Sequence, residues 1–186
     1  MKRFLSIITF ICVVFPIFAQ GDANHRYYMS FFARYNVVAL ENYNNKGYCL
    51  RVDMESDNQY VAPSLYIKYA NIENFIINLE IIKSQFIKYT KQAVKDNIKN
   101  IEIPLDSYFK RAFIVYNTRT RIYEDDNIKM KALFKVKEDG QCLAVIESSE
   151  FHAQKGDAVG TAHSFMIFQT FDEFDALINT AKKLTK

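Results

Sequence analysis

The chain has 186 residues and a formal net charge of +3; 49% of its residues are hydrophobic and 24% are charged. This composition is typical of a globular protein and excludes a disordered chain, and the small net charge gives no general attraction to nucleic acid or to an anionic membrane. The five glycines do not form a GxGxxG or Walker pattern, which argues against a nucleotide-dependent enzyme.

The first residues have the order of a secretory signal peptide. Lys2 and Arg3 precede the apolar run Phe4–Ala19, in which Pro16 lies near the end and Ala19 is a small residue suited to cleavage. A membrane anchor is the alternative, but a spanning helix needs about 20 apolar residues. We therefore expect residues 1–19 to be removed. Residues 20–186 would then form one exported domain, periplasmic or secreted, with a net charge of +1 and no later segment that spans a membrane.

The first half of the chain predicts strands followed by a long helix. The strands are expected at Arg26–Phe32, in a hairpin that turns at Lys46-Gly47, and at Ser64–Tyr69. Asn71 stands at the N-cap position of the helix, which extends toward Ile98. Its main apolar stripe consists of Ile72, Phe75, Ile76, Leu79, Ile82, Phe86 and Ala93.

Ile77 and Ile81 lie on nearly the opposite side of this helix from the main stripe. One interpretation is that they contact a loop or the N-terminal segment. The other is that they contact a second subunit or a partner, because an exposed apolar ridge often marks an interface. A homodimer is therefore one alternative.

The second half predicts the same order of elements. Ile101–Leu105 is interpreted as a linker, and Arg111–Asn117 as a strand that corresponds to Arg26–Phe32. A hairpin then turns at Asp139-Gly140, a favoured two-residue turn. A strand at His163–Gln169 and a shorter helix after Thr170 complete this half.

Two hairpin segments match without a gap when the sequence is shifted by 93 residues. Tyr35–Ser56 then aligns with Ile128–Ser149, and GYCLRV (47–52) aligns with GQCLAV (140–145). A match at this spacing indicates a duplicated subdomain rather than a solenoid.

A shift of 99 residues extends the match to the third strand and the helix, since Leu65–Lys83 aligns with Ser164–Lys182. We therefore expect two (β)βββα repeats, over about residues 25–99 and 108–186, related by a pseudo-two-fold. Antiparallel sheets with one long and one shorter amphipathic helix indicate an α+β fold. In the order of elements alone, this resembles the Whirly-type single-strand nucleic-acid binders, although export argues against nucleic acid as the partner.

Removal of the signal peptide leaves two cysteines, Cys49 and Cys142. A two-residue turn at Asp139-Gly140 would place Val136 opposite Leu143. Both cysteines would then face away from the core, partly exposed. They form a disulfide if the hairpins bring their Cα atoms within about 7 Å, and stay as two free thiols otherwise.

Three segments carry polar residues that suggest chemistry. In the loop 150–163, His152, Asp157 and His163 are weak candidates for metal ligands or for an acid and a base, although no HExxH or CxxC spacing is present. Glu124-Asp125-Asp126 lacks the pattern of a calcium loop and is interpreted as a polar turn. A row of lysines on one strand face suggests either a polyanion site or a solvated surface: Lys129, Lys131, Lys135 and Lys137.

No catalytic constellation emerges from these residues, so we expect a non-catalytic protein that binds an unknown protein or surface ligand, without a cofactor. The alternatives are a small hydrolase or metal-dependent site at the loop 150–163, and a polyanion binder that uses the lysine row.

Overall fold

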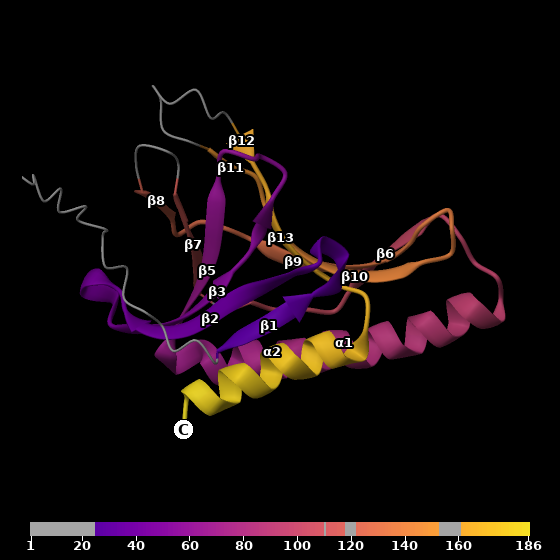
Figure 1. Cartoon of the computed structure of the whole chain (residues 1–186), viewed down its shortest axis with the longest axis horizontal. Coiled ribbons are helices and arrows are strands. Elements are labelled where there is room, and N and C mark those ends of the chain that lie inside the picture. Colours follow the sequence, from indigo (N-terminus) through magenta and orange to yellow (C-terminus); the bar gives the residue numbers. More distant parts are fainter. Residues whose placement is uncertain (1–24, 110, 118–121, 153–160) are drawn as a thin grey trace, which may run out of the picture.

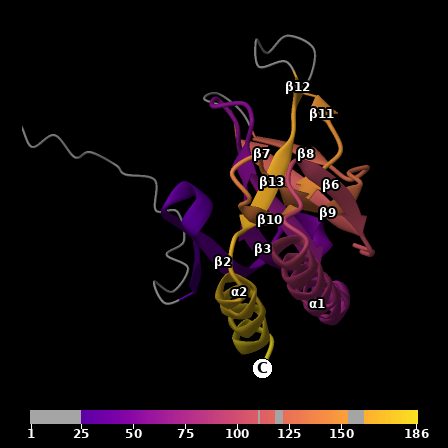
Figure 2. The same cartoon turned by 90° about the vertical axis from the view of Figure 1, so that its right-hand side faces the viewer.

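The computed structural model describes residues 25–109, 111–117, 122–152 and 161–186. Within these ranges the protein is α+β, as the sequence indicates, with two α-helices side by side along one side of antiparallel β-sheets (Figure 1). A view turned by 90° shows both helices beneath the sheets (Figure 2). The predicted signal peptide lies outside the described residues. Neither described α-helix is long and apolar enough to cross a membrane.

The larger sheet of the described chain has six strands in the order β1-β2-β3-β5-β7-β8. In that order they span Arg26–Met29, Arg34–Asn42, Tyr48–Asp53, Ala62–Lys68, Ala112–Asn117 and Ile122–Asp125. Every neighbouring pair is antiparallel. Short 3-10 turns η1 (Ser30–Phe32) and η2 (Asn44–Lys46) join its first three strands.

The second sheet of the described chain has five strands in the order β4-β13-β10-β9-β6. They span Glu55–Ser56, Ser164–Phe168, Cys142–Ser148, Met130–Val136 and Ile101–Leu105. Since β4 follows β3 after the single residue Met54, one stretch of chain enters both sheets. A separate ladder pairs β11 (Phe151–His152) with β12 (Thr161–Ala162).

The helices are α1 (Ile72–Lys95), preceded by the 3-10 turn η3 (Tyr69–Asn71), and α2 (Phe171–Leu184). They run antiparallel, because Glu80 contacts Lys182 (2.7 Å) and Lys83 contacts Asp175 (2.5 Å). Asn71 precedes α1 as expected, but its side chain makes no capping hydrogen bond.

The start of α2 is fixed by a capping box. The Thr170 side chain accepts from the backbone N–H of Glu173, and the Glu173 carboxylate accepts from the backbone N–H of Thr170 (2.9 Å). This local pattern satisfies two backbone donors that the first turn of a helix otherwise leaves unpaired. It also explains why the sequence locates this helix start well.

Phenylalanines join the helices to the second sheet. Phe86 of α1 is only 1% exposed, and its ring lies 6.0 Å from Phe134 of β9, 5.7 Å from Phe171 and 5.9 Å from Phe174 of α2. Phe174 in turn stacks on Phe168 of β13 at 4.1 Å. These contacts make Phe86 the centre of the junction between α1, α2 and the sheet.

The hairpin between β9 and β10 closes with a three-residue loop, not the expected two-residue turn. The N–H of Lys137 donates to the Gln141 carbonyl (2.9 Å), and the N–H of Gly140 donates to the Lys137 carbonyl (3.0 Å). Gly140 has φ of 86°, the left-handed conformation that ends this common type of loop. As a result Val136 pairs with Cys142 rather than with the next residue.

This one-residue difference turns every side chain of β10 to the other face. Phe134 packs on Phe86 of α1 and pairs with Ala144. Cys142 shares the face of Ala144, so it points toward α1, and Leu143 points away. The predicted orientation of β10 is therefore wrong.

The order of elements recurs within the chain, since β2-β3-β5 leads to α1 and β9-β10-β13 leads to α2. The aligned positions do not recur in the same orientation. Leu50 is fully buried in the main core, whereas Leu143, its match in the aligned sequence, lies on the face of its sheet away from α1. The duplication itself thus stays a prediction.

Two segments of the second half pair with other strands than the sequence predicts. Arg111–Asn117 corresponds to β7, which pairs with β5 of the first half rather than opening the second. Ile101–Leu105 is not a linker but β6, which pairs with β9 at the edge of the second sheet. An edge strand tolerates Pro104, because the missing N–H faces no further strand.

Candidate functional site

Only part of the loop 150–163 lies within the described residues. His152 ends β11, where its backbone pairs with Thr161, and Asp157 lies outside the described residues. His163 is exposed; its backbone N–H donates to Asp57 Oδ1 (2.8 Å), and its ring Nδ1 lies 3.3 Å from the Ser148 carbonyl oxygen. In the described ranges, no three His, Cys, Asp or Glu side chains gather where they could hold a metal ion.

The lysine row is largely paired with acids of neighbouring elements. Lys131 contacts Glu147 of β10 (2.8 Å), and Lys135 contacts Glu102 of β6 (2.8 Å). Lys137 contacts Asp139 of the hairpin loop (3.3 Å). These carboxylates offset the positive charge that a polyanion would need.

The two cysteines are free, so the disulfide considered above is not formed. Cys49 faces away from the main core as expected, but it is fully buried beneath the side chains of Tyr66, Phe113 and Val115. Cys142 is half-buried and faces α1. The two therefore lie in different clusters of different sheets, and burial raises the pKa of each thiol.

We expect the protein without residues 1–19 to release two equivalents of thionitrobenzoate from DTNB in guanidinium. In the native protein at pH 8, Cys142 should react more slowly than free cysteine, because its raised pKa leaves less thiolate. Cys49 should react only when the protein unfolds. The variants Cys49→Ala and Cys142→Ala assign the two phases, and fewer than two thiols in guanidinium would contradict the structure.

A network of polar side chains that the sequence did not reveal lies on the outer face of the six-stranded sheet, away from the main core. Arg51 of β3 contacts Glu41 of β2 (Nη1–Oε2 3.2 Å) and Asp53 (Nε–Oδ1 3.2 Å). Tyr66 of β5 donates its hydroxyl to Glu41 Oε1 (2.5 Å), and Ser64 donates to Asp53 Oδ1 (2.9 Å). These contacts fix five side chains across three adjacent strands.

Aromatic rings adjoin this network and cover Cys49. The ring of Tyr43 lies 4.6 Å from that of Tyr66 and 5.6 Å from that of Phe113, and the last two stack at 5.3 Å. Lys46 Nζ lies 4.0 Å from the centre of the Phe113 ring, a favourable cation–π distance.

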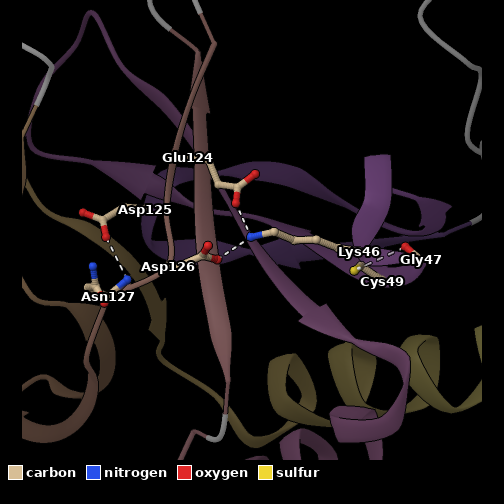
Figure 3. A network of polar contacts seen from close by, with 7 residues as sticks. All are labelled: Lys46, Gly47, Cys49, Glu124, Asp125, Asp126 and Asn127. Atoms are coloured by element: carbon tan, nitrogen blue, oxygen red, sulfur yellow. Dashed lines mark hydrogen bonds and ion pairs between the residues drawn. The ribbon is translucent and has the colours of Figure 1, made fainter.

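Lys46 ties the β2–β3 loop to β8. Its ammonium forms ion pairs with Glu124 and Asp126, and Asp125 accepts from the backbone N–H of Asn127 (2.9 Å) (Figure 3). Burial opposes the charged form of Lys46, but the two carboxylates outweigh it and raise the pKa. The acidic turn therefore holds a cation that the chain itself supplies, in keeping with a polar turn.

The protonation states of Tyr66 and Arg51 are fixed at neutral pH. Burial raises the pKa of the Tyr66 phenol, and the hydrogen bond to Glu41 raises it further. In Arg51, burial is outweighed by Asp53 and Glu41, which raise the pKa of the guanidinium. Proton transfer near neutral pH needs a group whose pKa lies close to the working pH. These two side chains are instead suited to fixed polar recognition.

A pocket of about 400 Å³ opens beside this network, where β2 and β3 part. Pairing between these strands runs only from Val38 and Val52 toward the hairpin, because β3 continues into β4, which pairs with β13. We call this the outer-face pocket; it is lined by Arg34, Tyr35, Asn36, Arg51, Asp53, Met54, Ala62, Pro63, Ser64 and Asn117.

Buried polar atoms without partners lie at this end of the sheet. Asn36 is 5% exposed and lies opposite Tyr27, on the core-facing side of β2. The Asn36 side chain acts as a hydrogen-bond partner of the Tyr27 hydroxyl and lowers its pKa against the larger effect of burial, although neither atom has a partner of normal geometry among the described residues. Glu55 pairs with Arg34 through Oε2 and leaves Oε1 unpaired. Since unpaired buried polar atoms are costly, they are commonly satisfied by water or a ligand.

Comparison of the chain with models of protein families, with curated proteins and with solved structures gave no match. The function is therefore argued from the chemistry of the outer-face pocket itself.

The sequence pattern predicts that some of these side chains lie on the outer face, but it does not predict the pocket. Arg51 and Asp53 alternate with Leu50 and Val52, which indicates a polar outer face on β3. No pattern in the neighbouring sequence indicates that β2 and β3 separate at this point.

Proposed function

We propose that this protein is an exported, non-catalytic binding protein that takes its ligand in the outer-face pocket. The observation that carries the proposal is a pocket with strand walls whose polar side chains Arg51, Asp53 and Ser64 are held in place by their neighbours. Its volume of about 400 Å³ falls in the range of small-molecule sites. Side chains already fixed by their neighbours lose little conformational entropy on binding, which favours affinity.

Binding rather than catalysis is supported by the state of the reactive groups nearby. The thiol of Cys49 is buried, and burial raises its pKa, so it is a poor nucleophile. The Tyr66 phenol stays protonated, since its pKa is raised, and does not act as a base near pH 7.

The proposal is tested by thermal-shift measurements with a library of small polar compounds. Ala62 is exposed at the mouth of the pocket, so Ala62→Trp should obstruct it without disturbing the core. We expect ligand-induced rises in Tm that Ala62→Trp abolishes. The matched variant Ala70→Trp alters a separate hollow of about 480 Å³ near the start of α1 and should leave the rises intact. The proposal fails if no compound raises Tm, if Ala62→Trp has no effect, or if a compound is turned over.

Export is tested by the mass of the protein isolated from the periplasm or the medium of expressing cells. We expect a chain that begins at Gln20, as the small residue Ala19 indicates. A chain that keeps Met1 and stays with the cytoplasm would contradict export.

A second contact is supported by Ile77 and Ile81 of α1, which are 46% and 43% exposed. Their exposure fits a homodimer or another protein partner and favours it over cover by a loop of the described chain. We expect the wild-type protein to show a dimer mass by light scattering that Ile77→Lys with Ile81→Lys reduces to the monomer. A monomeric mass for both proteins contradicts the homodimer.

A further inference from the structure

The outer-face pocket lies where β3 leaves the six-stranded sheet. Asp53 is the last residue of β3, and it pairs with Ser64 of β5. The chain then turns into β4 of the other sheet, so β2 and β5 continue without another described strand between them. Tyr35 and Ala62 lie on these two walls, each two residues beyond the row of Asp53 and on the same outer face. The pocket is therefore flanked by two strands and has Asp53 at one end.

Among the residues that the structure describes, the polar network beside the pocket has one more carboxylate than cation. Arg51 contacts Glu41 and Asp53, each at 3.2 Å, so one guanidinium serves two carboxylates. Glu41 uses both oxygens, one for Arg51 and one for the Tyr66 hydroxyl. Asp53 uses Oδ1 for Arg51 and Ser64, and Oδ2 accepts no hydrogen bond from the described residues. Because the Asp53 side chain is 33% exposed, this second oxygen is open to the pocket.

An anionic ligand is disfavoured, although two arginines line the pocket. The Arg34 guanidinium pairs with Glu55, whose side chain is 8% exposed. An anion that took Arg34 would leave a buried carboxylate without its cation, which is costly. Arg51 is likewise occupied, by Glu41 and Asp53. Within the described part of the chain, neither arginine therefore offers an unpaired positive charge to a ligand.

A cationic ligand displaces no existing ion pair. It would compensate the excess negative charge through Asp53 Oδ2, whereas a neutral ligand would leave that charge unopposed. A guanidinium group prefers both oxygens of one carboxylate, but only one oxygen of Asp53 is open. An ammonium is a compact charge that binds a single oxygen. Its other N–H groups can donate to the Ser64 hydroxyl oxygen, which lies 2.9 Å from Asp53 Oδ1 and retains a lone pair. The pocket therefore fits an ammonium.

The walls beyond Asp53 suit an apolar stem. Tyr35 is 65% exposed, and its ring lies 5.0 Å from that of Tyr28, its cross-strand partner. Ala62 on the other wall presents only a methyl group. A chain of methylene groups between these walls would remove apolar surface of both from water. The face of a tyrosine ring also attracts a nearby ammonium.

We infer that the outer-face pocket binds an aliphatic primary amine, with its ammonium at Asp53 Oδ2 and its stem between Tyr35 and Ala62. The inference rests on the binding function proposed above and names the class of its ligand. A free amine and the lysine side chain of a polypeptide share this chemistry, so the experiment includes a probe for each.

The test is NMR titration of the ¹⁵N-labelled chain from Gln20 to Lys186, near pH 7, with three probes of similar length: pentylamine, 1-pentanol and pentanoate. We expect pentylamine to shift amide resonances of β2, β3 and β5 with a Kd at least about tenfold below that of 1-pentanol, because hydrogen bonds between charged groups are the stronger class. Pentanoate should not bind. Binding of Nα-acetyl-lysine amide as well would identify a lysine side chain as the source, and binding of pentylamine alone a free amine.

Variants assign the site. Asp53→Asn should weaken pentylamine binding about tenfold, and Tyr35→Ala should weaken it about threefold, more than Tyr35→Phe, which keeps the ring. The matched control Glu138→Gln removes an equal charge from the exposed β9–β10 loop of the second sheet and should bind as the wild type does. Tm shows that each variant is folded. Since loss of the Asp53 charge also affects Arg51, the comparison of probes on the wild type gives an independent result.

The amine inference is overturned if pentylamine does not bind, if 1-pentanol or pentanoate binds as tightly, or if Glu138→Gln weakens binding as much as Asp53→Asn. If a compound of another class raises Tm and Ala62→Trp abolishes the rise, the proposed binding function stands without the amine. If no compound binds in the pocket, both fail.

Discussion

Replacement of Phe86 by alanine is expected to lower the free energy of unfolding by about 3–5 kcal/mol. Phe86 is 1% exposed and contacts rings of β9 and α2, so its loss opens a cavity where three elements meet. A cavity bounded by two helices and a sheet cannot collapse without moving one of them, which places the cost in the upper part of the usual range.

The measurement is urea denaturation followed by far-UV circular dichroism. Phe86→Leu keeps most of the volume and should cost about 1.5 kcal/mol. Ile81→Ala, on the exposed side of the same helix, should change stability by no more than about 0.5 kcal/mol. Equal losses for Phe86→Ala and Ile81→Ala would contradict the packing of α1 described here.

Replacement of Glu173 by alanine is expected to cost about 3 kcal/mol, far more than the loss of an ordinary helix cap. Its carboxylate is 6% exposed and accepts three backbone N–H groups, from Ser30 (2.6 Å), Gln169 (2.5 Å) and Thr170 (2.9 Å). The first of these comes from η1, so the same side chain starts α2 and anchors the turn after β1. Without it, three donors lose a charged acceptor.

Urea denaturation again gives the free energy of unfolding. Glu173→Gln keeps one acceptor oxygen and should fall between the wild type and the alanine variant. Glu80→Ala removes an exposed carboxylate paired with Lys182 and should cost less than about 0.5 kcal/mol. A loss in Glu173→Ala as small as that in Glu80→Ala would show that Glu173 acts only as a surface charge.

Features set by nearby residues could be predicted from the sequence. The start of α2 follows from Thr170 and Glu173, which lie three residues apart. The main stripe of α1 and the exposed pair Ile77 and Ile81 follow from helical spacing alone.

The orientation of β10 could not be predicted, because Leu143, Ala144, Val145 and Ile146 are all apolar and all buried. Such a run fits either face, so the register depended on the loop. Asp139-Gly140 suits a two-residue turn and also the end of a three-residue loop.

The outer-face pocket could not be predicted from a single sequence. It depends on the departure of β3 toward β13, a partner more than a hundred residues later in the chain. It depends also on β7, which brings Asn117 beside Ala62. Each pairing is a choice among many strands, and local sequence patterns do not encode that choice.

The stretch from β3 to β4 has a mechanical consequence. Because residues 48–56 hydrogen-bond first to one sheet and then to the other, sliding of the sheets past each other would strain a single segment of backbone. The two layers are therefore coupled as one cooperative unit, and amide protons of β3 and β13 should exchange with solvent through a common opening event. The mouth between β2 and β3 would widen or narrow only as that whole unit distorts.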